Sequence, residues 1–103
     1  MSVLVEFAMF PTDKGESVST YVSRIIKMFS ESGVSYQLTP MGTIFETEEM
    51  LEAMQLITQA QECLMMDCNR IYSSIKIDIQ KGKSNRMKTK INSIENKIGK
   101  VNT

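Results

Sequence analysis

The stretch SYQLTPMGTIFETEE, from Ser35 to Glu49, decides the fold. Residues Ser35 to Thr39 alternate between apolar and polar, as a half-buried strand does, and Thr43 to Glu46 predicts a second strand. Pro40 and Gly42, between the two runs, are turn residues. We therefore expect a β-hairpin. A hairpin flanked on each side by one helix and one further strand is the middle of a βαββαβ chain.

The flanking patterns supply the other elements. Residues 3–10 alternate with both faces mostly apolar, which favours a central strand. A first helix is expected between an N-cap at Ser17 and a stop at Gly33, and a second helix is expected after an N-cap at Thr47. Residues 70–79 predict a last strand, with an isoleucine face packed on the helices and a polar face left open.

Two further features refine this outline. Gln61 falls inside the apolar face of the second helix, where a polar group needs a partner. It either reaches across an interface or bonds a neighbouring backbone group in the core, and we expect the core. A last helix is expected to begin near Ser84 with an apolar stripe that suits docking against a partner or the domain body. The stripe consists of Met87, Ile91, Ile94 and Ile98.

The expected architecture is one domain over residues 1–103, with a core over 3–80 and a C-terminal helix over 84–100. Right-handed crossovers predict the strand order 4-1-3-2, with the strands at 3–10 and 43–47 expected to be parallel at the centre. Covering the exposed face of so small a sheet favours a homo-oligomer.

The composition argues against several chemistries. The chain has no histidine, and its two cysteines are poorly spaced for joint metal binding, so no metal site is expected. No phosphate-binding glycine motif is present, and a serine or cysteine nucleophile would lack its usual base. We therefore expect no catalytic residue and no cofactor. An active site built on the carboxylates of Glu6, Glu46 and Asp78 is the enzymatic alternative.

Charge and hydropathy indicate where the protein acts. No run approaches the roughly 20 apolar residues of a spanning helix, and the N-terminal pattern suits a strand rather than a signal peptide, so we expect a cytoplasmic protein without membrane contact. Residues 1–80 hold five Lys/Arg and eleven Asp/Glu, whereas residues 81–103, the basic tail, hold seven Lys/Arg and one Asp/Glu. The basic tail is expected to lie on an acidic neighbour. Nucleic-acid binding ranks last because aromatic residues are missing from this segment.

The sequence also resembles a known family. The segments FP, SVSTYV, PMGT with a following Glu46, and RIYSSIKID occur in the order and at the separations found in the small thiamine-binding protein family. They begin at Phe10, Ser17, Pro40 and Arg70. The chain is also similar to the repeated domain of a bacterial hydroxymethylpyrimidine and thiamine-binding protein. The resemblance covers Val3 to Ile98.

The resemblance implies an α+β, ferredoxin-like sandwich that assembles as a homotetramer, a dimer of dimers. It also implies binding of thiamine or its pyrimidine moiety without catalysis. Ligand contacts are implied for Ser17, Ser19, Tyr21, Met41, Gly42, Thr43, Lys76 and Asp78. Because thiamine is a permanent cation, a site for it should add a carboxylate and aromatic surface, for which Glu46 and Tyr72 are the candidates beside Asp78.

This chain departs from the family pattern at three positions. Ile79 and Gln80 stand where family members often carry an acidic residue and an arginine, and Gln61 stands where a histidine is common. A second reading of the chain is a structural or regulatory homo-oligomer that binds other proteins through methionine-rich helices. The methionines concerned are Met50, Met54, Met65 and Met66.

Overall fold

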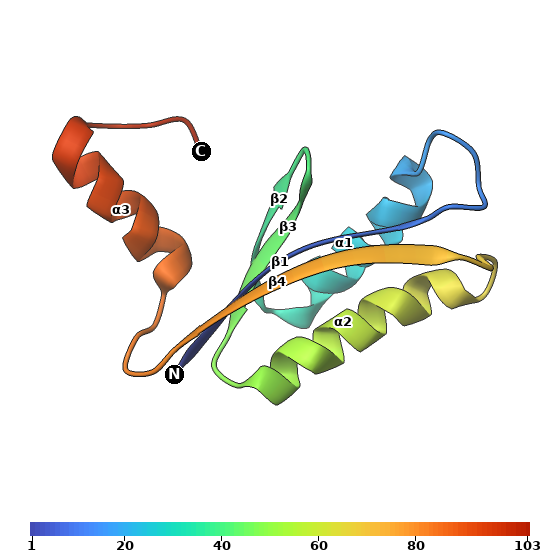
Figure 1. The fold of residues 1–103 in the computed structure, drawn as a ribbon, viewed down its shortest axis with the longest axis horizontal. Coiled ribbons are helices and arrows are strands. Elements are labelled where there is room, and N and C mark those ends of the chain that lie inside the picture. The colour runs from blue at the N-terminus through green and yellow to red at the C-terminus, as the bar shows by residue number, and fades with distance from the viewer.

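The computed structural model describes residues 1–103. Its elements, in chain order, are β1 (Ser2–Pro11), α1 (Ser19–Ser32), β2 (Ser35–Thr39), β3 (Gly42–Thr47), α2 (Met50–Met65), β4 (Ile71–Gln80) and α3 (Arg86–Ile98). Figure 1 shows β1 and β4 running side by side, with the β2–β3 hairpin rising from the same sheet. The predicted hairpin and the α+β, ferredoxin-like fold are confirmed.

The four strands form one sheet in the order β2-β3-β1-β4, which confirms the predicted order and the central place of β1. The predicted parallel pairing of β1 and β3 is wrong, because the two strands are antiparallel, with Val3 opposite Thr47 and Phe7 opposite Thr43. The crossover through α1 makes β1 and β2 run the same way. The hairpin then reverses the chain, so β3 opposes both of its neighbours.

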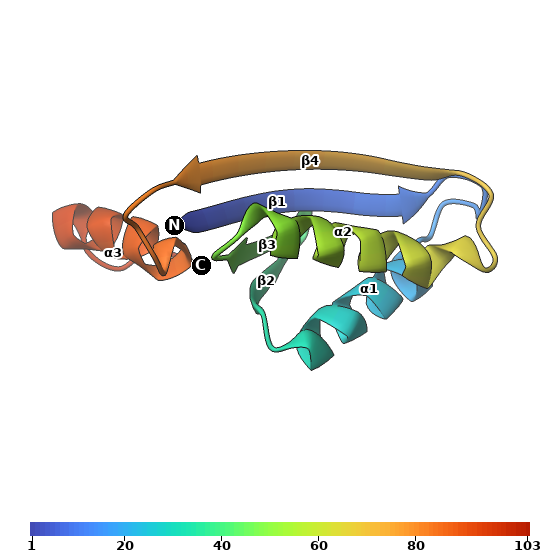
Figure 2. The ribbon, with the colours of Figure 1, turned by 90° about the horizontal axis from the view of Figure 1, so that it is seen from below.

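Both α1 and α2 cover the same face of the sheet, and the core lies between the two layers, as Figure 2 shows. Every second residue of β1 from Val3 to Met9 is buried there, against Phe29 of α1, Phe45 of β3 and Leu64 of α2. The residues between them on β1 face the opposite side, which has no helix layer. We call this side the open face.

The helix ends differ partly from expectation. Gly33 closes α1 with a φ of 79°, as predicted. The predicted caps are wrong. The N-cap residues are Val18 and Glu49, and neither makes a side-chain capping bond. Thr47 is instead the last residue of β3, where it pairs with Val3 of β1. Its hydroxyl donates to the Glu49 carbonyl at 2.9 Å.

The helix layer is narrower than the sheet. Ile77 pairs with the buried Val5 and so points to the predicted helix side. However, α2 packs against β1 and β3, and Ile77 remains 37% exposed. Ile71 packs against the core as predicted, but the predicted burial of Ile75, Ile77 and Ile79 is wrong. Gln61 is also exposed, contrary to prediction, because the buried face of α2 runs through Ala60 and Leu64 instead.

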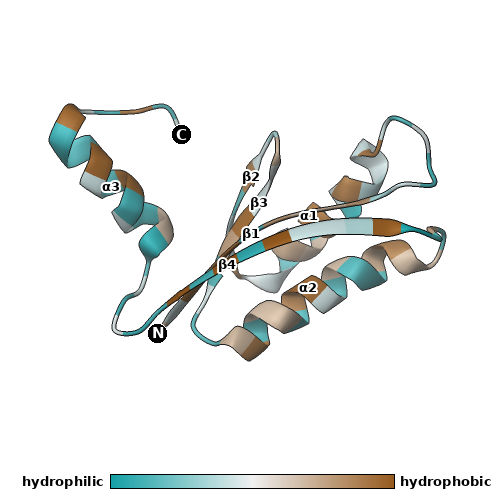
Figure 3. Cartoon of the chain, in the orientation of Figure 1, coloured by the Kyte–Doolittle hydropathy of each residue, from teal (hydrophilic) through white to brown (hydrophobic).

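The last helix, α3, extends away from the domain body, and the molecule measures 45 × 29 × 22 Å. Its first turn is anchored to the sheet, whereas Ile94 is 48% and Ile98 73% exposed. Figure 3 shows that hydrophobic and hydrophilic segments alternate along α3. None of the three helices combines the length and apolar character that crossing a bilayer requires.

Candidate functional site

A small apolar pocket lies between the start of α1, the hairpin tip and the far end of β1. Its volume is about 290 Å³, and nine of its thirteen lining residues are hydrophobic. The lining residues are Phe7, Ala8, Met9, Phe10, Val18, Val22, Ile25, Leu38, Thr39, Pro40, Met41, Gly42 and Thr43. We call it the hairpin pocket. Its volume is at the lower end of the range of about 300–1,000 Å³ for small-molecule sites, which suits a single ring system.

The pocket exists because the strands differ in length. The strand β1 has ten residues, but β3 has six and pairs with β1 only as far as Phe7. Beyond Phe7, the side of β1 that faces the hairpin has no strand partner. The helix α1 covers this gap with Val18, Val22 and Ile25.

Backbone polar groups of β1 point into this gap. Thr12 N–H donates to the Arg70 carbonyl at 2.9 Å, so the even-numbered residues of β1 direct their backbone groups to β4. Because these groups alternate along an antiparallel strand, those of Phe7 and Met9 point toward the hairpin. The Phe7 carbonyl meets β3, but Met9 lies beyond the last pair. The Met9 N–H and C=O are therefore an unpaired donor and acceptor in an apolar pocket.

The hairpin tip is fixed by close contacts. A Cβ atom at Gly42 would lie 2.9 Å from the Phe7 carbonyl oxygen, which explains why glycine occupies this position. The Thr39 hydroxyl donates to the Gly42 carbonyl at 2.8 Å and accepts from the Met41 N–H at 3.3 Å. These bonds hold the rim of the hairpin pocket in place.

The residues predicted at the first helix start do not line the pocket. Met41, Gly42 and Thr43 do line it, whereas Ser17 and Ser19 are exposed beside it. Tyr21 faces another side of α1, where the Arg24 guanidinium lies 4.9 Å from its ring centre. The Arg24 guanidinium pairs with Asp67 at 2.8 Å and, mainly by hydrogen bonding, lowers the pKa of Asp67 to about 2.

The predicted residues of β4 lie on the open face, across the sheet from the helices. Tyr72 stacks against Phe10 with ring centres 5.8 Å apart and is 58% exposed. Lys76 pairs with Glu6 at 2.7 Å. Lys76 and Asp78 also border a shallow groove of about 380 Å³ that Leu4 and Ile44 floor. Lys76 and Asp78 are therefore separate from the hairpin pocket, whereas Tyr72 contacts Phe10, one of its lining residues.

Glu46 holds the start of α3. Its carboxylate accepts the Arg86 N–H at 3.0 Å and the Met87 N–H at 3.2 Å, and also accepts the Ser2 hydroxyl. Partial burial favours the neutral acid, but the bonds from Ser2, Arg86 and Met87 outweigh it and lower the pKa of Glu46. The carboxylate thus satisfies two of the free N–H groups at the start of α3.

Arg86 completes this anchor from the other side. Its side chain is buried and donates to the Ser2 hydroxyl at 2.9 Å, the Ser2 carbonyl at 3.0 Å and the Asp78 carbonyl at 2.5 Å. Its guanidinium also pairs with the Asp78 carboxylate at 3.1 Å, and Lys90 approaches that carboxylate at 3.6 Å. Both carboxylates predicted to contact a cation are therefore engaged in fixing α3.

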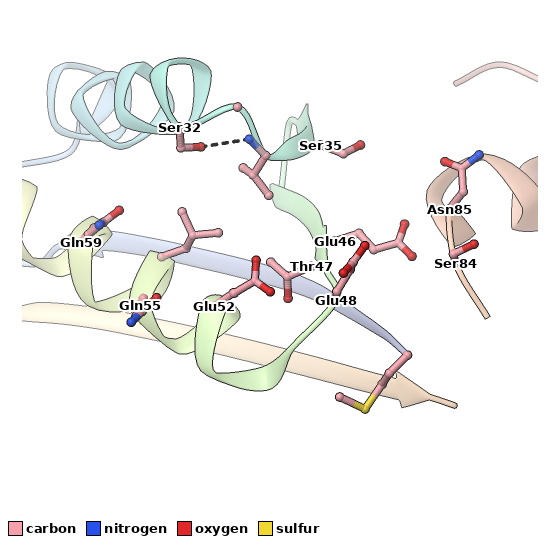
Figure 4. A pocket seen from close by; sticks show the side chains of 14 residues that line it. Ser32, Ser35, Glu46, Thr47, Glu48, Glu52, Gln55, Gln59, Ser84 and Asn85 are labelled. Atoms are coloured by element: carbon pink, nitrogen blue, oxygen red, sulfur yellow. Dashed lines mark hydrogen bonds between the residues drawn. The ribbon is translucent and has the colours of Figure 1, made fainter. Parts of the chain in front are cut away.

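A larger, acidic cleft, shown in Figure 4, was not predicted from the sequence. It has a volume of about 750 Å³ and lies between the end of α1, the start of α2 and the loop before α3. Glu46, Glu48 and Glu52 border it, with Gln55 and Gln59 further along α2. Glu48 and Glu52 were not among the site residues predicted from the sequence. These glutamates are not placed to bind a metal together, since no group of three or more His, Cys, Asp or Glu side chains in the chain could hold a metal ion.

Some of the residues that make the hairpin pocket a cavity were also not predicted from the sequence. Val18, Val22, Leu38 and Met9 line the pocket but were not among the predicted site residues. The available signal was the unequal length of the strands, because a ten-residue strand beside a six-residue one must leave an unpaired end.

Comparisons with known proteins match this architecture. A UPF0045 protein of Methanocaldococcus jannaschii is 33% identical over 92 residues, covering 89% of this chain and 91% of the relative. A crystal structure of the M. jannaschii protein MJ1052 has a TM-score of 0.81 at 32% identity, covering 90% of this chain and 95% of the other. A UPF0045 protein of Staphylococcus xylosus is 34% identical over 100 residues, covering 89% of this chain and 91% of the relative.

A more distant structure shares the fold. A Thermotoga maritima protein, named for a proposed role in thiamine biosynthesis or salvage, has a TM-score of 0.73 at 22% identity, covering 87% of this chain and 97% of the other. The model of the family described as "Thiamine-binding protein" matches residues 5–95, which is most of the chain. The chain therefore belongs to the thiamine-binding protein family.

Proposed function

We propose that the hairpin pocket binds the pyrimidine ring of thiamine, or a related pyrimidine such as hydroxymethylpyrimidine, without catalysing a reaction. The unpaired backbone of Met9 carries this proposal. An aminopyrimidine presents a donor and an acceptor side by side on one edge, and an extended residue presents an N–H and a C=O in the same way. The ligand would supply the partner that β3 fails to provide.

The rest of the pocket suits the flat faces of such a ring. Phe7, Val22, Ile25 and Leu38 provide apolar surface, and the side-chain hydroxyls come from Thr39 and Thr43. No carboxylate lines the pocket. The positively charged thiazolium of thiamine would therefore remain at the mouth, in contact with water, and the pyrimidine part alone would retain most of the affinity.

The lining also supports binding rather than catalysis. None of the thirteen residues has a side chain that titrates near neutral pH, so the pocket offers no general acid or base. Membership of a thiamine-binding family agrees with a binding role.

Filling the pocket should abolish binding while leaving the fold intact. Leu38 is 56% exposed on the pocket wall, so Leu38→Trp places a large ring over the cavity without disturbing the core. We expect its affinity for hydroxymethylpyrimidine, measured by titration calorimetry, to fall at least tenfold, about 1.4 kcal/mol or more. Lys97→Ala, on the distant α3, is the control and should bind like the wild type.

The same titration tests the residues predicted on β3 and β4. Glu46, Tyr72, Lys76 and Asp78 lie outside the hairpin pocket, so their role in ligand binding stays a prediction. Asp78→Asn should leave pyrimidine affinity near the wild-type value. A loss of affinity in Asp78→Asn together with full binding by Leu38→Trp would move the site to the open face and contradict the hairpin pocket.

We also propose that the protein is a homo-oligomer, with the tetramer expected from its family. Two unpartnered surfaces support this: the open face, with its apolar residues Leu4 and Ile44, and the α3 stripe, on which Ile98 is 73% exposed. Isolated helices of this length are marginally stable in water, so an apolar stripe that does not contact the rest of its own chain gains from a partner.

A cytoplasmic location fits the cysteines. Cys63 and Cys68 are both free thiols, and burial raises the pKa of each. Unpaired cysteines of low reactivity are usual where the surroundings are reducing.

Protein binding through methionine-rich helices is the second candidate function. Met65 is 54% and Met66 95% exposed at the end of α2, and such flexible side chains adapt to varied partners. Calorimetry that detects no heat with thiamine or hydroxymethylpyrimidine would favour this candidate.

A further inference from the structure

A second hollow, of about 360 Å³, lies on the helix side of the sheet, between the later part of α2 and the strands β1 and β4. It exists because α2 packs against β1 and β3 and leaves that side of β4 largely uncovered. Eight residues line it, and five of them are hydrophobic. Met9 is the one residue that borders both this hollow and the hairpin pocket. The ligand proposed for the hairpin pocket therefore gives this hollow no role.

Three of the eight lining residues carry sulfur, whereas the whole chain has nine methionines and two cysteines among its 103 residues. The three are Met9 of β1, Met65 of α2 and Cys68 of the loop between α2 and β4. Sulfur is therefore concentrated around this one hollow, and it comes from three separate parts of the fold. We call it the sulfur hollow.

Backbone hydrogen bonds hold the three sulfur residues near one another. The Cys68 N–H donates to the carbonyl four residues earlier at 3.1 Å, so the helical turn continues to Cys68. Residues three apart on such a turn are neighbours, with Cβ atoms about 5–6 Å apart, which puts Met65 beside Cys68. The Asn69 N–H donates to the Asp13 carboxylate at 2.8 Å and ties this loop to the segment just past β1. Met9 and Cys68 also belong to the same packed core, with exposed fractions of 6% and 5%.

The sulfur hollow offers one thiol and otherwise neutral groups. Its remaining polar side chains are the amides of Gln61 and Asn69 and the hydroxyl of Ser73. The Cys68 thiol donates to the Asp67 carboxylate at 3.6 Å, and the Arg24 guanidinium already balances that carboxylate. A cation bound in the hollow thus meets a single anionic ligand, the Cys68 thiolate. One thiolate neutralises a monovalent cation, whereas a divalent cation would keep a net charge in mostly apolar surroundings, which is costly.

We propose that the sulfur hollow binds one Cu(I) ion through the Cys68 thiolate and the thioethers of Met9 and Met65. Thiolate and thioether are soft ligands, which favour Cu(I) over hard cations. On binding, the S–H bond of Cys68 breaks, a Cu–S bond forms and the proton passes to solvent, so the copper keeps its oxidation state. Met65, which is 54% exposed, provides a flexible ligand at the rim. The sequence-based expectation of no metal site took histidine, the cysteine pair and carboxylates into account, but not thioethers.

Competition with a coloured Cu(I) chelator such as bathocuproine disulfonate, in the absence of oxygen, tests this site. The wild-type protein should withdraw one Cu(I) per chain from the chelator. Cys68→Ala should lower the Cu(I) affinity by about a hundredfold or more, because even an outer-sphere partner of a metal contributes about 10–100-fold. Met9→Leu and Met65→Leu keep the side-chain volume but remove the sulfur, and each should lower the affinity by about tenfold or more.

Two sulfur residues outside the hollow provide matched controls. Cys63→Ala removes the other thiol, and Met66→Leu removes a neighbouring thioether that is 95% exposed. Both variants should bind Cu(I) like the wild type, and X-ray absorption of the wild-type complex should show three sulfur neighbours around copper.

Three results would each overturn the Cu(I) site. They are a wild type that takes no Cu(I) from the chelator, a loss in Cys63→Ala as large as in Cys68→Ala, and unchanged affinity in both Met9→Leu and Met65→Leu. Met65 lies at the exposed rim, so Met65→Leu tests the site even where Cys68→Ala destabilises the core. The titration contains no pyrimidine, so none of these results bears on the hairpin pocket.

Discussion

Replacing Arg86 with alanine should lower the free energy of unfolding by about 2–4 kcal/mol, because it removes several charge-assisted hydrogen bonds from a buried site. The Arg86 guanidinium bonds the Ser2 hydroxyl and carbonyl and both the carbonyl and the carboxylate of Asp78. Its loss leaves buried acceptors with fewer donors. Urea unfolding followed by circular dichroism measures the effect.

The same substitution should release α3. Its exposed stripe contributes little packing to its own domain, and a free helix of thirteen residues is marginal in water. Hydrogen exchange of the α3 amides should therefore accelerate more than that of β1. Lys97→Ala, also on α3 but exposed, is the control. If Arg86→Ala matched Lys97→Ala within about 0.5 kcal/mol, the anchoring role of Arg86 would be wrong.

Gly42→Ala is the second change with a large expected effect. The added Cβ would lie 2.9 Å from the Phe7 carbonyl oxygen, and a backbone atom cannot move aside as a flexible side chain can. The hairpin tip must shift away from β1, at a cost of about 1–3 kcal/mol. Thermal or urea unfolding measures this loss, and pyrimidine affinity should fall with it because the rim of the hairpin pocket moves.

Gly82→Ala separates the effect of a steric clash, as at Gly42, from the effect of backbone strain. Gly82 has a φ of 72° and open space around its Cβ position, so alanine there costs backbone strain alone, about 1 kcal/mol. It also lies far from the hairpin pocket, so ligand affinity should not change. Equal pyrimidine affinity in Gly42→Ala and Gly82→Ala would show that the close approach of Gly42 to Phe7 does not shape the pocket.

The elements of this fold were predictable because their signals are local. The alternation in residues 3–10, the turn at Pro40 and Gly42, and the left-handed stop at Gly33 each depend on neighbouring residues only. The direction of β3 relative to β1 was predicted wrongly, although it follows from the topology itself: a crossover followed by a hairpin makes the two central strands antiparallel.

The site was less predictable because its residues take their roles from distant contacts. Glu46 and Asp78 are carboxylates on strands, which suggested a cation site, but both meet Arg86, forty residues beyond Glu46 in sequence. Nothing local to either acid indicates that partner. Likewise, the unpaired backbone of Met9 results from the shortness of β3, and no side chain signals it.

The most direct test of the central claim is the amide signal of Met9 in an NMR hydrogen-exchange experiment. The proposal places a pyrimidine edge on the Met9 N–H, which has no strand partner in the free protein. Saturating hydroxymethylpyrimidine should shift the Met9 amide resonance and slow its exchange at least tenfold, while the already paired Val5 changes little. Saturable binding that leaves the Met9 amide resonance and its exchange rate unchanged would contradict the hairpin pocket as the ligand site.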